Sequence, residues 1–525
     1  MSTLVLAALL LAGIVVLTPV AERVKVPLPV LLTVYGLVLP VLPGMPVLSL
    51  EPDLILPLVL PPLLFAATQR ATAREFRDQS RSILLLAVGL TVISAAAAAW
   101  VAWLAGLGWG AAWVLGAVVA PPDPVAATAV ARRLRLPHRV VTVLEGEGMF
   151  NDATALVLYG AAVATVVSGH LTPGEVGGRL VLAVVGGVGV GLVGGLLTRW
   201  ALAALRIAAA ETLVTLAAPF AVYLLAELVH GSGVLAVLAL GLYLRSYGHP
   251  AISSGGWLLG RAVWGFADYV ITCVVFVLIG FELTDVLRRS TPQVDVILLA
   301  ATVIVTLVVV RLALVYPAAR LARLPWRGQV PDAPAGWRET LVVGWAGMRG
   351  VVTVATALAL PLTTASGEPF PHRDTIIAVG LGTVLLTLVV QGLTLSPLVR
   401  GLGVGTAGSA APEVAALRQR AAAAALDSVR SADPDVPEAV RRAAELQYEG
   451  YLAAQEALSA SRLGSRSTAR DGNSGDADHL DAVLHRASEA ERAVVLEARR
   501  KGEVSAEAAD EVLADVEARA LRDLS

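Results

Sequence analysis

The sequence predicts an all-α polytopic membrane protein of about thirteen transmembrane helices, followed by a helical cytoplasmic tail. The first observation behind this fold class is composition. Of 525 residues, 56% are hydrophobic and only 16% are charged, and the mean hydropathy is +0.72. A soluble core cannot hide that much apolar surface. The other two observations are a series of long apolar segments and a charge-rich C-terminal region.

The apolar segments account for most of the first 400 residues. A bilayer core of ~30 Å needs about 20 apolar residues per helix, and fewer where a helix is broken inside protein. The segments predicted on this basis are 3–20, 27–42, 54–68, 82–105, 110–131, 140–167, 179–199, 209–229, 233–246, 260–283, 295–317, 339–361 and 374–399. The first segment lacks the basic residues that open a cleavable signal peptide, so we interpret it as a spanning helix.

Charge divides the chain near residue 400 and also orients it. Residues 401–525 contain 15 basic and 22 acidic residues, whereas the first 400 contain 25 and 20. This predicts a transmembrane domain at 1–400 and a soluble tail at 401–525. Within the transmembrane domain, 18 Arg and Lys fall in the loops on one side and four in the loops on the other. The positive-inside rule then places the N-terminus outside the plasma membrane and the tail in the cytoplasm.

The tail is rich in Ala, Arg and Glu with helical periodicity. Its predicted helices are 411–432, 436–462, 476–500 and 503–522, with a polar linker at 464–475. This pattern fits a solubilising or dimer-supporting appendage, and it also fits a sensing role.

Three motifs place ionisable residues at membrane depth, where charges are costly and mark function. In the first, Asp123 lies in the run APPDPV at 120–125. The surrounding prolines remove backbone donors and break the helix. Such a break is tolerated only inside protein or beside a cavity, and its freed carbonyls can coordinate a cation. The alternative interpretation is a proline kink with a structural Asp.

The second motif, EGEGMFNDAT at 145–154, lies on the next helix. Glu147 and Asn151 share a helix face, and Asp152 is rotated by about 100° from Asn151. Burial penalises the charged form of a lone carboxylate, so Asp152 is suited to exchanging a proton for a cation near neutral pH. Hard cations prefer oxygen ligands, which carboxylate, amide and backbone carbonyl groups supply. The alternative is a structural acid paired with an arginine.

The third motif is GWAGMRGV at 344–351, where glycines loosen the helix around Arg349. An unpaired arginine at this depth is costly, so we expect Arg349 to pair with Glu147. We also expect Asp268 and Arg311 to pair between neighbouring helices.

Together these motifs resemble the monovalent cation:proton antiporter family, which comprises the sodium/proton exchangers and their bacterial relatives. The family's DPVA at a broken helix matches 123–126, its GE-x-x-x-ND helix matches 146–152, and its RG helix matches 349–350. Supporting matches, which extend the resemblance over nearly the whole chain, lie at 60–65, 276–280, 391–397 and 491–524.

The resemblance implies thirteen helices in two inverted six-helix repeats, arranged as a homodimer. The broken helices 110–131 and 339–361 would cross beside the ion site. It further implies that Asp152 binds a cation or a proton in turn, and that Asn151 accompanies electroneutral one-for-one exchange. An elevator-like movement of one bundle would give alternating access.

Three positions depart from the family's pattern and leave the transported cation open. Ala66, Pro122 and Gly148 stand where many relatives have an acid, a Thr and a Ser. Each change removes a side-chain oxygen near the expected site. Backbone carbonyls, water, Thr154 or Thr353 are candidates to replace these oxygens.

The resulting hypothesis is a secondary antiporter, without enzymatic activity, that exchanges Na⁺, K⁺ or Li⁺ for H⁺ in pH and cation homeostasis. Its ion- or proton-binding residues would be Asp123, Asn151, Asp152 and Thr154. Expected partners are the cation, the proton, the bilayer and a second copy of the chain. We expect no nucleic acid, no cofactor and no metal beyond the transported cation; the single cysteine, Cys273, excludes a Cys-based metal site.

Two alternatives stay open. One is another ion-coupled transporter or a channel on the same scaffold, which the missing acid at Ala66 mildly favours. The other is a membrane sensor that signals through its tail. The run 186–195 contains glycines at nucleotide-motif spacing, but it lies in an apolar helix and predicts close helix packing.

Overall fold

The computed structural model describes most of the chain, and the described part is helical. It covers residues 3–24, 26–41, 52–69, 84–123, 127–128, 131, 136–168, 173–289, 294–322, 336–404, 411–431, 437–460 and 474–523. In these ranges the only β-type pairing is an isolated bridge between Thr363 and Pro369. Seven described helices are long and apolar enough to cross a membrane, and shorter apolar helices accompany them. The predicted all-α membrane fold is confirmed, whereas the count of thirteen and the inverted repeats stay predictions.

The first half of the transmembrane part consists of helices that fall on the predicted apolar segments. They are α1 (Thr3–Val24), α2 (Leu28–Val38) with a 3-10 turn η1 (Leu39–Val41), α3 (Pro52–Thr68), a π-helical stretch η2 (Leu84–Leu90), α6 (Thr91–Leu104), α7 (Trp109–Val119), α9 (His138–Ser168) and α10 (Pro173–Ala204). In α3, Pro57, Pro61 and Pro62 lie inside the helix.

The second half follows the same pattern. Its helices are α11 (Ala208–Leu228), α12 (Gly233–Tyr243), the short turns η3 (Leu244–Gly248) and η4 (His249–Ala251), α13 (Ser254–Arg289), α14 (Val294–Ala322), α15 (Trp337–Trp345), α16 (Val351–Leu358) and α17 (Arg373–Leu402). The predicted segment 339–361 is therefore two helices separated by residues 346–350. The basic loops at 70–81 and 132–139, which contribute to the predicted orientation, lie largely outside the described residues.

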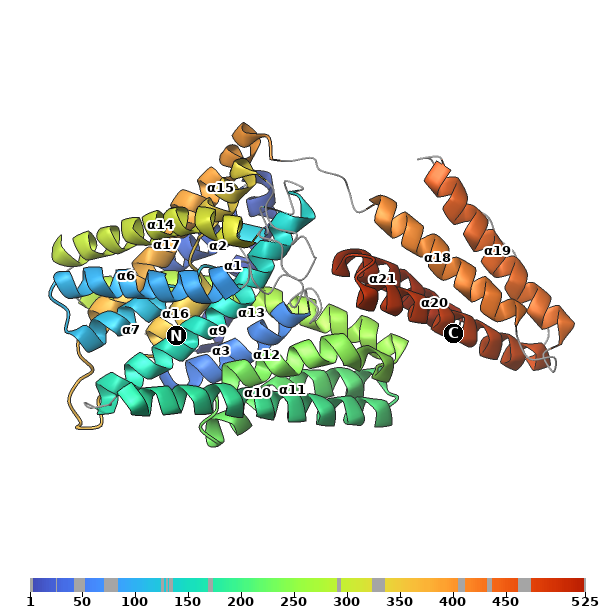
Figure 1. Cartoon of the computed structure of the whole chain (residues 1–525), viewed down its shortest axis with the longest axis horizontal. Coiled ribbons are helices and arrows are strands. Elements are labelled where there is room, and N and C mark those ends of the chain that lie inside the picture. Colours follow the sequence, from blue (N-terminus) through green and yellow to red (C-terminus); the bar gives the residue numbers. More distant parts are fainter. Residues whose placement is uncertain are drawn as a thin grey trace. The chain divides into compact units, whose positions relative to one another are not determined.

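The helices around the two breaks enclose the largest buried apolar cluster. In Figure 1, α6 runs beside α7 and α14, and α7 also packs against α9 and α17. Fully buried members of the cluster include Leu115 of α7, Phe276 of α13 and Leu307 of α14. Because this packing surrounds α16 and the ends of α7, the irregular backbone of both breaks is inside protein, as such backbone must be at membrane depth.

Close helix packing explains the glycine-rich run of α10, as predicted. A side-chain carbon on Gly187 would overlap the carbonyl oxygen of Ser232, and one on Gly191 would overlap that of Ala236. Both neighbours belong to the start of α12 or to the turn before it. The glycines therefore let α10 approach the α12 backbone.

The chain divides into two compact units. The first comprises Met1–Thr198, Leu216–Arg245 and Trp264–Ala407. The second comprises Arg199–Thr215, Ser246–Val263 and Gly408–Ser525, so it joins the tail to the adjoining ends of α10, α11 and α13.

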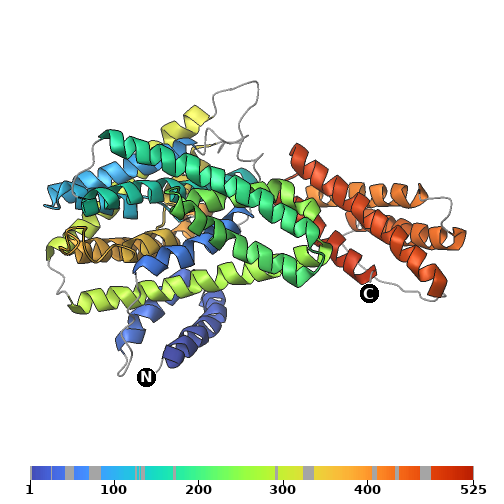
Figure 2. The same cartoon turned by 90° about the horizontal axis from the view of Figure 1, so that it is seen from below.

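The tail forms a bundle of four helices. They are α18 (Ala411–Arg430), α19 (Glu438–Ala460), α20 (Ser474–Lys501) and α21 (Ala506–Asp523), close to the four predicted helices. The predicted linker at 464–475 lies largely outside the described residues. Both views show the four helices side by side (Figures 1 and 2).

Buried ion pairs accompany the small apolar cores of this bundle. Arg519 contacts both carboxylate oxygens of Glu491, at 2.9 and 3.0 Å. Arg492 contacts Glu517 at 2.6 Å and also Ser254 Oγ at 2.6 Å. The Glu491 and Glu517 side chains are fully buried. Trp257 packs against one apolar core of the bundle, so the first turn of α13 belongs to the tail's own unit.

Candidate functional site

The break in the predicted segment 110–131 begins where the prolines begin. Helix α7 ends at Val119, and residues 120–123 are not helical. Pro121 and Pro122 lack N–H donors, so neither can continue the backbone hydrogen bonding of α7. The carbonyls that the break frees are used by side chains, because those of Val119, Ala120 and Pro122 each accept a hydrogen bond from another helix or break.

The second break, residues 346–350, crosses the first and is bonded to it. The backbone N–H of Asp123 donates to the carbonyl of Met348 at 2.6 Å. Gly350 is the N-cap residue of α16, and a side-chain carbon added to it would overlap the Asp123 carboxylate. The carboxylate of Asp123 therefore takes the place that the side chain of a capping residue would have, beside the positive end of α16. The predicted crossing of two broken helices is confirmed.

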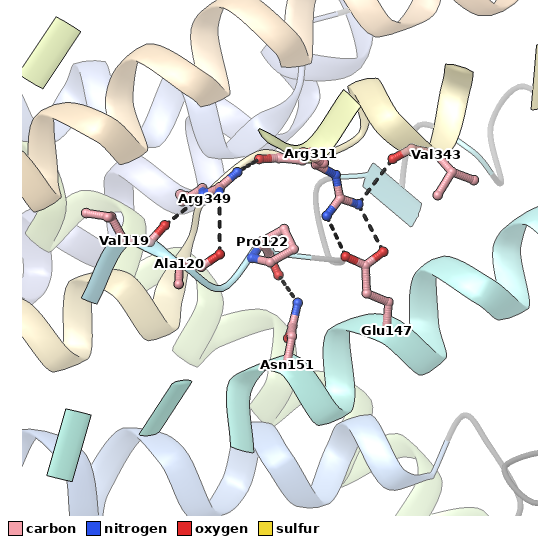
Figure 3. A network of polar contacts seen from close by, with 9 residues as sticks. Val119, Ala120, Pro122, Glu147, Asn151, Arg311, Val343 and Arg349 are labelled. Carbon is pink, nitrogen blue, oxygen red and sulfur yellow. Dashed lines mark hydrogen bonds and ion pairs between the residues drawn. The ribbon is translucent and has the colours of Figure 1, made fainter. Parts of the chain in front are cut away.

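Arg349 is held by the freed carbonyls rather than by an acid. Its Nε donates to Val119 O at 2.9 Å, its Nη2 to Ala120 O at 3.3 Å, and its Nη1 to Gly347 O. Its backbone N–H donates to Thr387 Oγ1 at 3.0 Å. The side chain thus joins both breaks, as Figure 3 shows.

Glu147 forms its ion pair with Arg311 of α14. The pair is bidentate, with Nη1–Oε1 at 2.5 Å and Nη2–Oε2 at 2.9 Å, and both side chains are 3% exposed. Arg311 Nη2 also donates to Val343 O of α15 at 3.1 Å (Figure 3). A side-chain carbon at Gly347 would overlap Arg311, so the second break also makes room for this arginine.

The predicted pairs Glu147–Arg349 and Asp268–Arg311 are both wrong. The first fails because a broken helix supplies carbonyl acceptors, which satisfy Arg349 without a carboxylate. The second fails because the terminal nitrogens of Arg311 are bonded to Glu147 of α9 and to the carbonyl of Val343. Sequence reasoning missed the role of Arg311; the available signal was a lone arginine inside a long apolar segment.

Asn151 and Asp152 lie beside the first break. Asn151 is fully buried and its Nδ2 donates to Pro122 O at 2.9 Å (Figure 3). Its Oδ1 is buried without a hydrogen-bond partner. Asp152, the next residue, is half-buried, and no hydrogen bond or ion pair to its carboxylate occurs among the described residues. Of the acids of this helix whose side chains are described, Glu147 is paired with Arg311 and Asp152 is without a partner among the described residues.

The other predicted site residues are placed as follows. Thr154 Oγ1 donates its proton to Phe150 O of its own helix at 2.8 Å. The hydroxyl oxygen can therefore act only as an acceptor or a cation ligand. Ala66 and Gly148 are buried, and the Pro122 carbonyl is taken by Asn151. Within the described residues no group of three or more His, Cys, Asp or Glu could hold a metal ion.

Comparison with known proteins gives consistent results. A family model described as "Sodium/hydrogen exchanger, transmembrane" matches residues 6–401. An uncharacterised Na⁺/H⁺ exchanger of Mycobacterium tuberculosis is 36% identical, over 81% of this chain and 79% of that one. The Na⁺/H⁺ antiporter ApNhaP of Aphanothece halophytica is 30% identical, over 72% and 70%. The solved structure of the sodium proton antiporter MjNhaP1 from Methanocaldococcus jannaschii shares the fold, with a TM-score of 0.60 at 19% identity, over 76% and 98%.

Proposed function

Since the chain belongs to the sodium/hydrogen exchanger family, we propose that it exchanges one monovalent cation for one proton at Asp152 by alternating access. The observation that carries the proposal is the carboxylate of Asp152, which lies next to the crossing of the two breaks without a cationic partner in the described structure. Asn151, Asp123 and Thr154 would line the same site, with Asn151 holding the backbone of the break in place.

Charge balance supports one-for-one exchange. The five charged side chains described above are three acids, Asp123, Glu147 and Asp152, and two arginines, Arg311 and Arg349. Their formal charges leave one negative charge, which one monovalent cation or one proton neutralises. Because Arg311 compensates Glu147 and Arg349 lies beside the break that carries Asp123, the remaining charge is assigned to Asp152.

The proposed cycle uses this single site from both sides of the membrane. A cation from the cytoplasm displaces the proton of Asp152, and the bundle that carries the crossing moves to face outside. There a proton replaces the cation, and the bundle returns. Each step trades a cation for a proton on one carboxylate, so no covalent intermediate or cofactor takes part. The amide oxygen of Asn151, which has no hydrogen-bond partner, is of the ligand type that hard cations prefer.

The proposal also covers the setting of the transporter. Residues 1–400 would form the transport domain and 401–525 the tail, in a homodimer of the plasma membrane. The N-terminus would lie outside and the tail in the cytoplasm, which the excess of basic residues in one set of loops supports.

The test is cation-dependent proton movement in proteoliposomes, with Na⁺, Li⁺ and K⁺ added in turn and internal pH followed by fluorescence. We expect at least one cation to collapse a preset pH gradient, and Asp152→Asn to abolish the response because the amide cannot bind or release the proton. Asp295→Asn, an exposed acid in the first turn of α14, is the matched control and should transport normally. A wild type that responds to none of the three cations between pH 6 and 9, despite verified insertion, would refute the proposal.

A further inference from the structure

The hydroxyl of Thr353 differs from most other buried threonine hydroxyls of the described transmembrane helices. Those hydroxyls donate to the carbonyl four residues earlier, which satisfies the polar group inside the helix. Examples are Thr33 to Pro29, Thr198 to Gly194, Thr356 to Val352, Thr383 to Val379 and Thr387 to Thr383. Thr353 is 1% exposed, and its Oγ1 has no hydrogen-bond partner.

The break explains why Thr353 cannot form the usual bond. The residue four positions earlier is Arg349, which lies in the non-helical break, so its carbonyl is not aligned with α16. The carbonyl of Gly350 accepts the backbone N–H of Val354 at 3.3 Å. A buried hydroxyl without a partner costs free energy, so a group that could bind it at another stage of the cycle would offset that cost.

The position of Thr353 in α16 directs it to the Asp123 side of the helix. Gly350 is the N-cap, so Thr353 is the third helical residue. The side chains of these two positions face one another in a capping box. Gly350 has no side chain, and the Asp123 carboxylate occupies the position that its side-chain carbon would have. The helix register therefore places Thr353 on the same side of α16 as Gly350, the residue beside that carboxylate.

A second unpartnered oxygen lies beside the other break, that of residues 120–123. Asn151 Oδ1 is buried without a partner, while the amide nitrogen of the same side chain is bonded to Pro122, next to Asp123. Helix α16 packs against both α7 and α9, which carry the break and Asn151. Thr91 also has an unpartnered hydroxyl, but it follows the π-helical stretch and has no comparable tie to Asp123, so it is not assigned to the site.

We propose that Thr353 Oγ1 is a ligand of the transported alkali cation, together with Asn151 Oδ1 and the Asp152 carboxylate. The inference rests on the proposed antiport. Thr353 would supply a neutral side-chain oxygen to the site. Many relatives have oxygen-bearing side chains at three positions where this chain has Ala66, Pro122 and Gly148. A hydroxyl adds a ligand without adding charge, so it sets affinity and selectivity among Na⁺, Li⁺ and K⁺ while leaving one-for-one exchange unchanged.

The test compares Thr353→Val, Thr353→Ser and Thr353→Ala with the wild type in proteoliposomes, at fixed pH and varied cation concentration. Thr356→Val is the matched control, because Thr356 lies on the same helix, is equally buried and satisfies its hydroxyl within the helix. We expect Thr353→Val and Thr353→Ala to raise the cation KM about tenfold, the effect of losing a ligand interaction of ordinary strength. Thr353→Ser should stay within about twofold of wild type, and Thr356→Val should not change KM.

The outcomes separate the inference from the function that it rests on. An unchanged cation KM in Thr353→Val and Thr353→Ala, with normal maximal transport, overturns the ligand role and leaves antiport intact. A KM as high in Thr353→Ser as in Thr353→Val also overturns it, because packing of the methyl group would then be responsible. If Thr353→Val does not insert, the contrast between Thr353→Ala and Thr353→Ser decides. Absence of cation-dependent proton movement in the wild type instead refutes the proposed function.

Discussion

At the scale of single residues, Arg311 and Arg349 are both buried near the two breaks but are held by different groups. Arg311 faces a carboxylate in bidentate geometry. Among the described residues, the Arg349 side chain donates to carbonyls, those of Val119, Ala120 and Gly347. Removing one partner of a buried ion pair leaves the other charge uncompensated, whereas neutralising both partners removes most of that penalty. The two arginines are therefore distinguishable by double substitution.

Glu147→Gln should lower the thermal stability of the detergent-solubilised protein strongly, by about 3–5 kcal/mol, because Arg311 would keep its charge without a partner. Combining it with Arg311→Gln should recover a large part of the lost stability. The combination with Arg349→Gln serves as the matched control and should recover much less, because Arg349 forms no hydrogen bond with Glu147 in the described structure. Melting curves read by size-exclusion chromatography measure this; recovery in the Arg349 combination and not in the Arg311 combination would contradict the observed pairing.

Sequence alone identified the acids of the site but not their partners. Asp123, Glu147 and Asp152 stand out because a carboxylate in an apolar segment is costly wherever it points. Which arginine meets Glu147 depends on how α14 packs beside it and on the carbonyls that the break frees near Arg349. The spacing of residues along the sequence encodes neither of these tertiary features, so the predicted pair was wrong.

At the scale of elements, the crossing of the two breaks organises the site. Prolines made the break after Val119 predictable, because they remove donors at fixed positions. Apolar segments also predicted most helix centres. Their ends were less predictable, as α13 extends over Ser254–Arg289 instead of 260–283. A hydropathy scan detects only the apolar part of a helix, whereas the hydrogen-bonded helix continues through the charged turns beyond it.

Gly350→Ala tests the crossing directly. The added methyl group would overlap the Asp123 carboxylate, so it should push the two breaks apart and weaken the hydrogen bond from Asp123 N to Met348 O. We expect loss of at least about 90% of cation-dependent proton movement, equivalent to at least about 1.4 kcal/mol.

The control for this substitution is Gly382→Ala on α17, where an added carbon meets no neighbouring atom within 4 Å. It should transport like the wild type at equal membrane abundance. Normal transport by Gly350→Ala would mean that the contact between the breaks is dispensable.

At the scale of the whole molecule, the second unit combines the tail with short stretches at the ends of α10, α11 and α13. Charge composition predicted the tail, because the transmembrane domain is charge-poor, and helical periodicity predicted its four helices. It could not predict that Trp257 and Ser254 of α13 contact the tail, since these contacts join residues far apart in the sequence.

Arg492→Ala should destabilise this unit more than the loss of an exposed ion pair does. It leaves the fully buried Glu517 without its cation and removes the bond to Ser254, at a cost of about 1–3 kcal/mol. Arg420→Ala is the control, because the Arg420–Glu503 pair is 52% and 40% exposed and such pairs contribute about 0.2–1 kcal/mol. Hydrogen–deuterium exchange of α20 and α21 in the full-length protein should accelerate in the first variant only. Equal acceleration in both would show that burial of the pair gives no added stability.

The two buried arginines bear on membrane voltage. In the proposed cycle, a site loaded with either a cation or a proton would carry no net charge when both arginines are in place, whereas an empty site would keep the one uncompensated charge of Asp152. Voltage acts on a moving charge with about 2.3 kcal/mol per 100 mV, and the low dielectric penalises it further. In the proposed cycle the loaded bundle would cross without either effect and the empty bundle would meet both. Coupling would then follow from electrostatics, because a carrier that cannot cross empty does not leak the ion gradient.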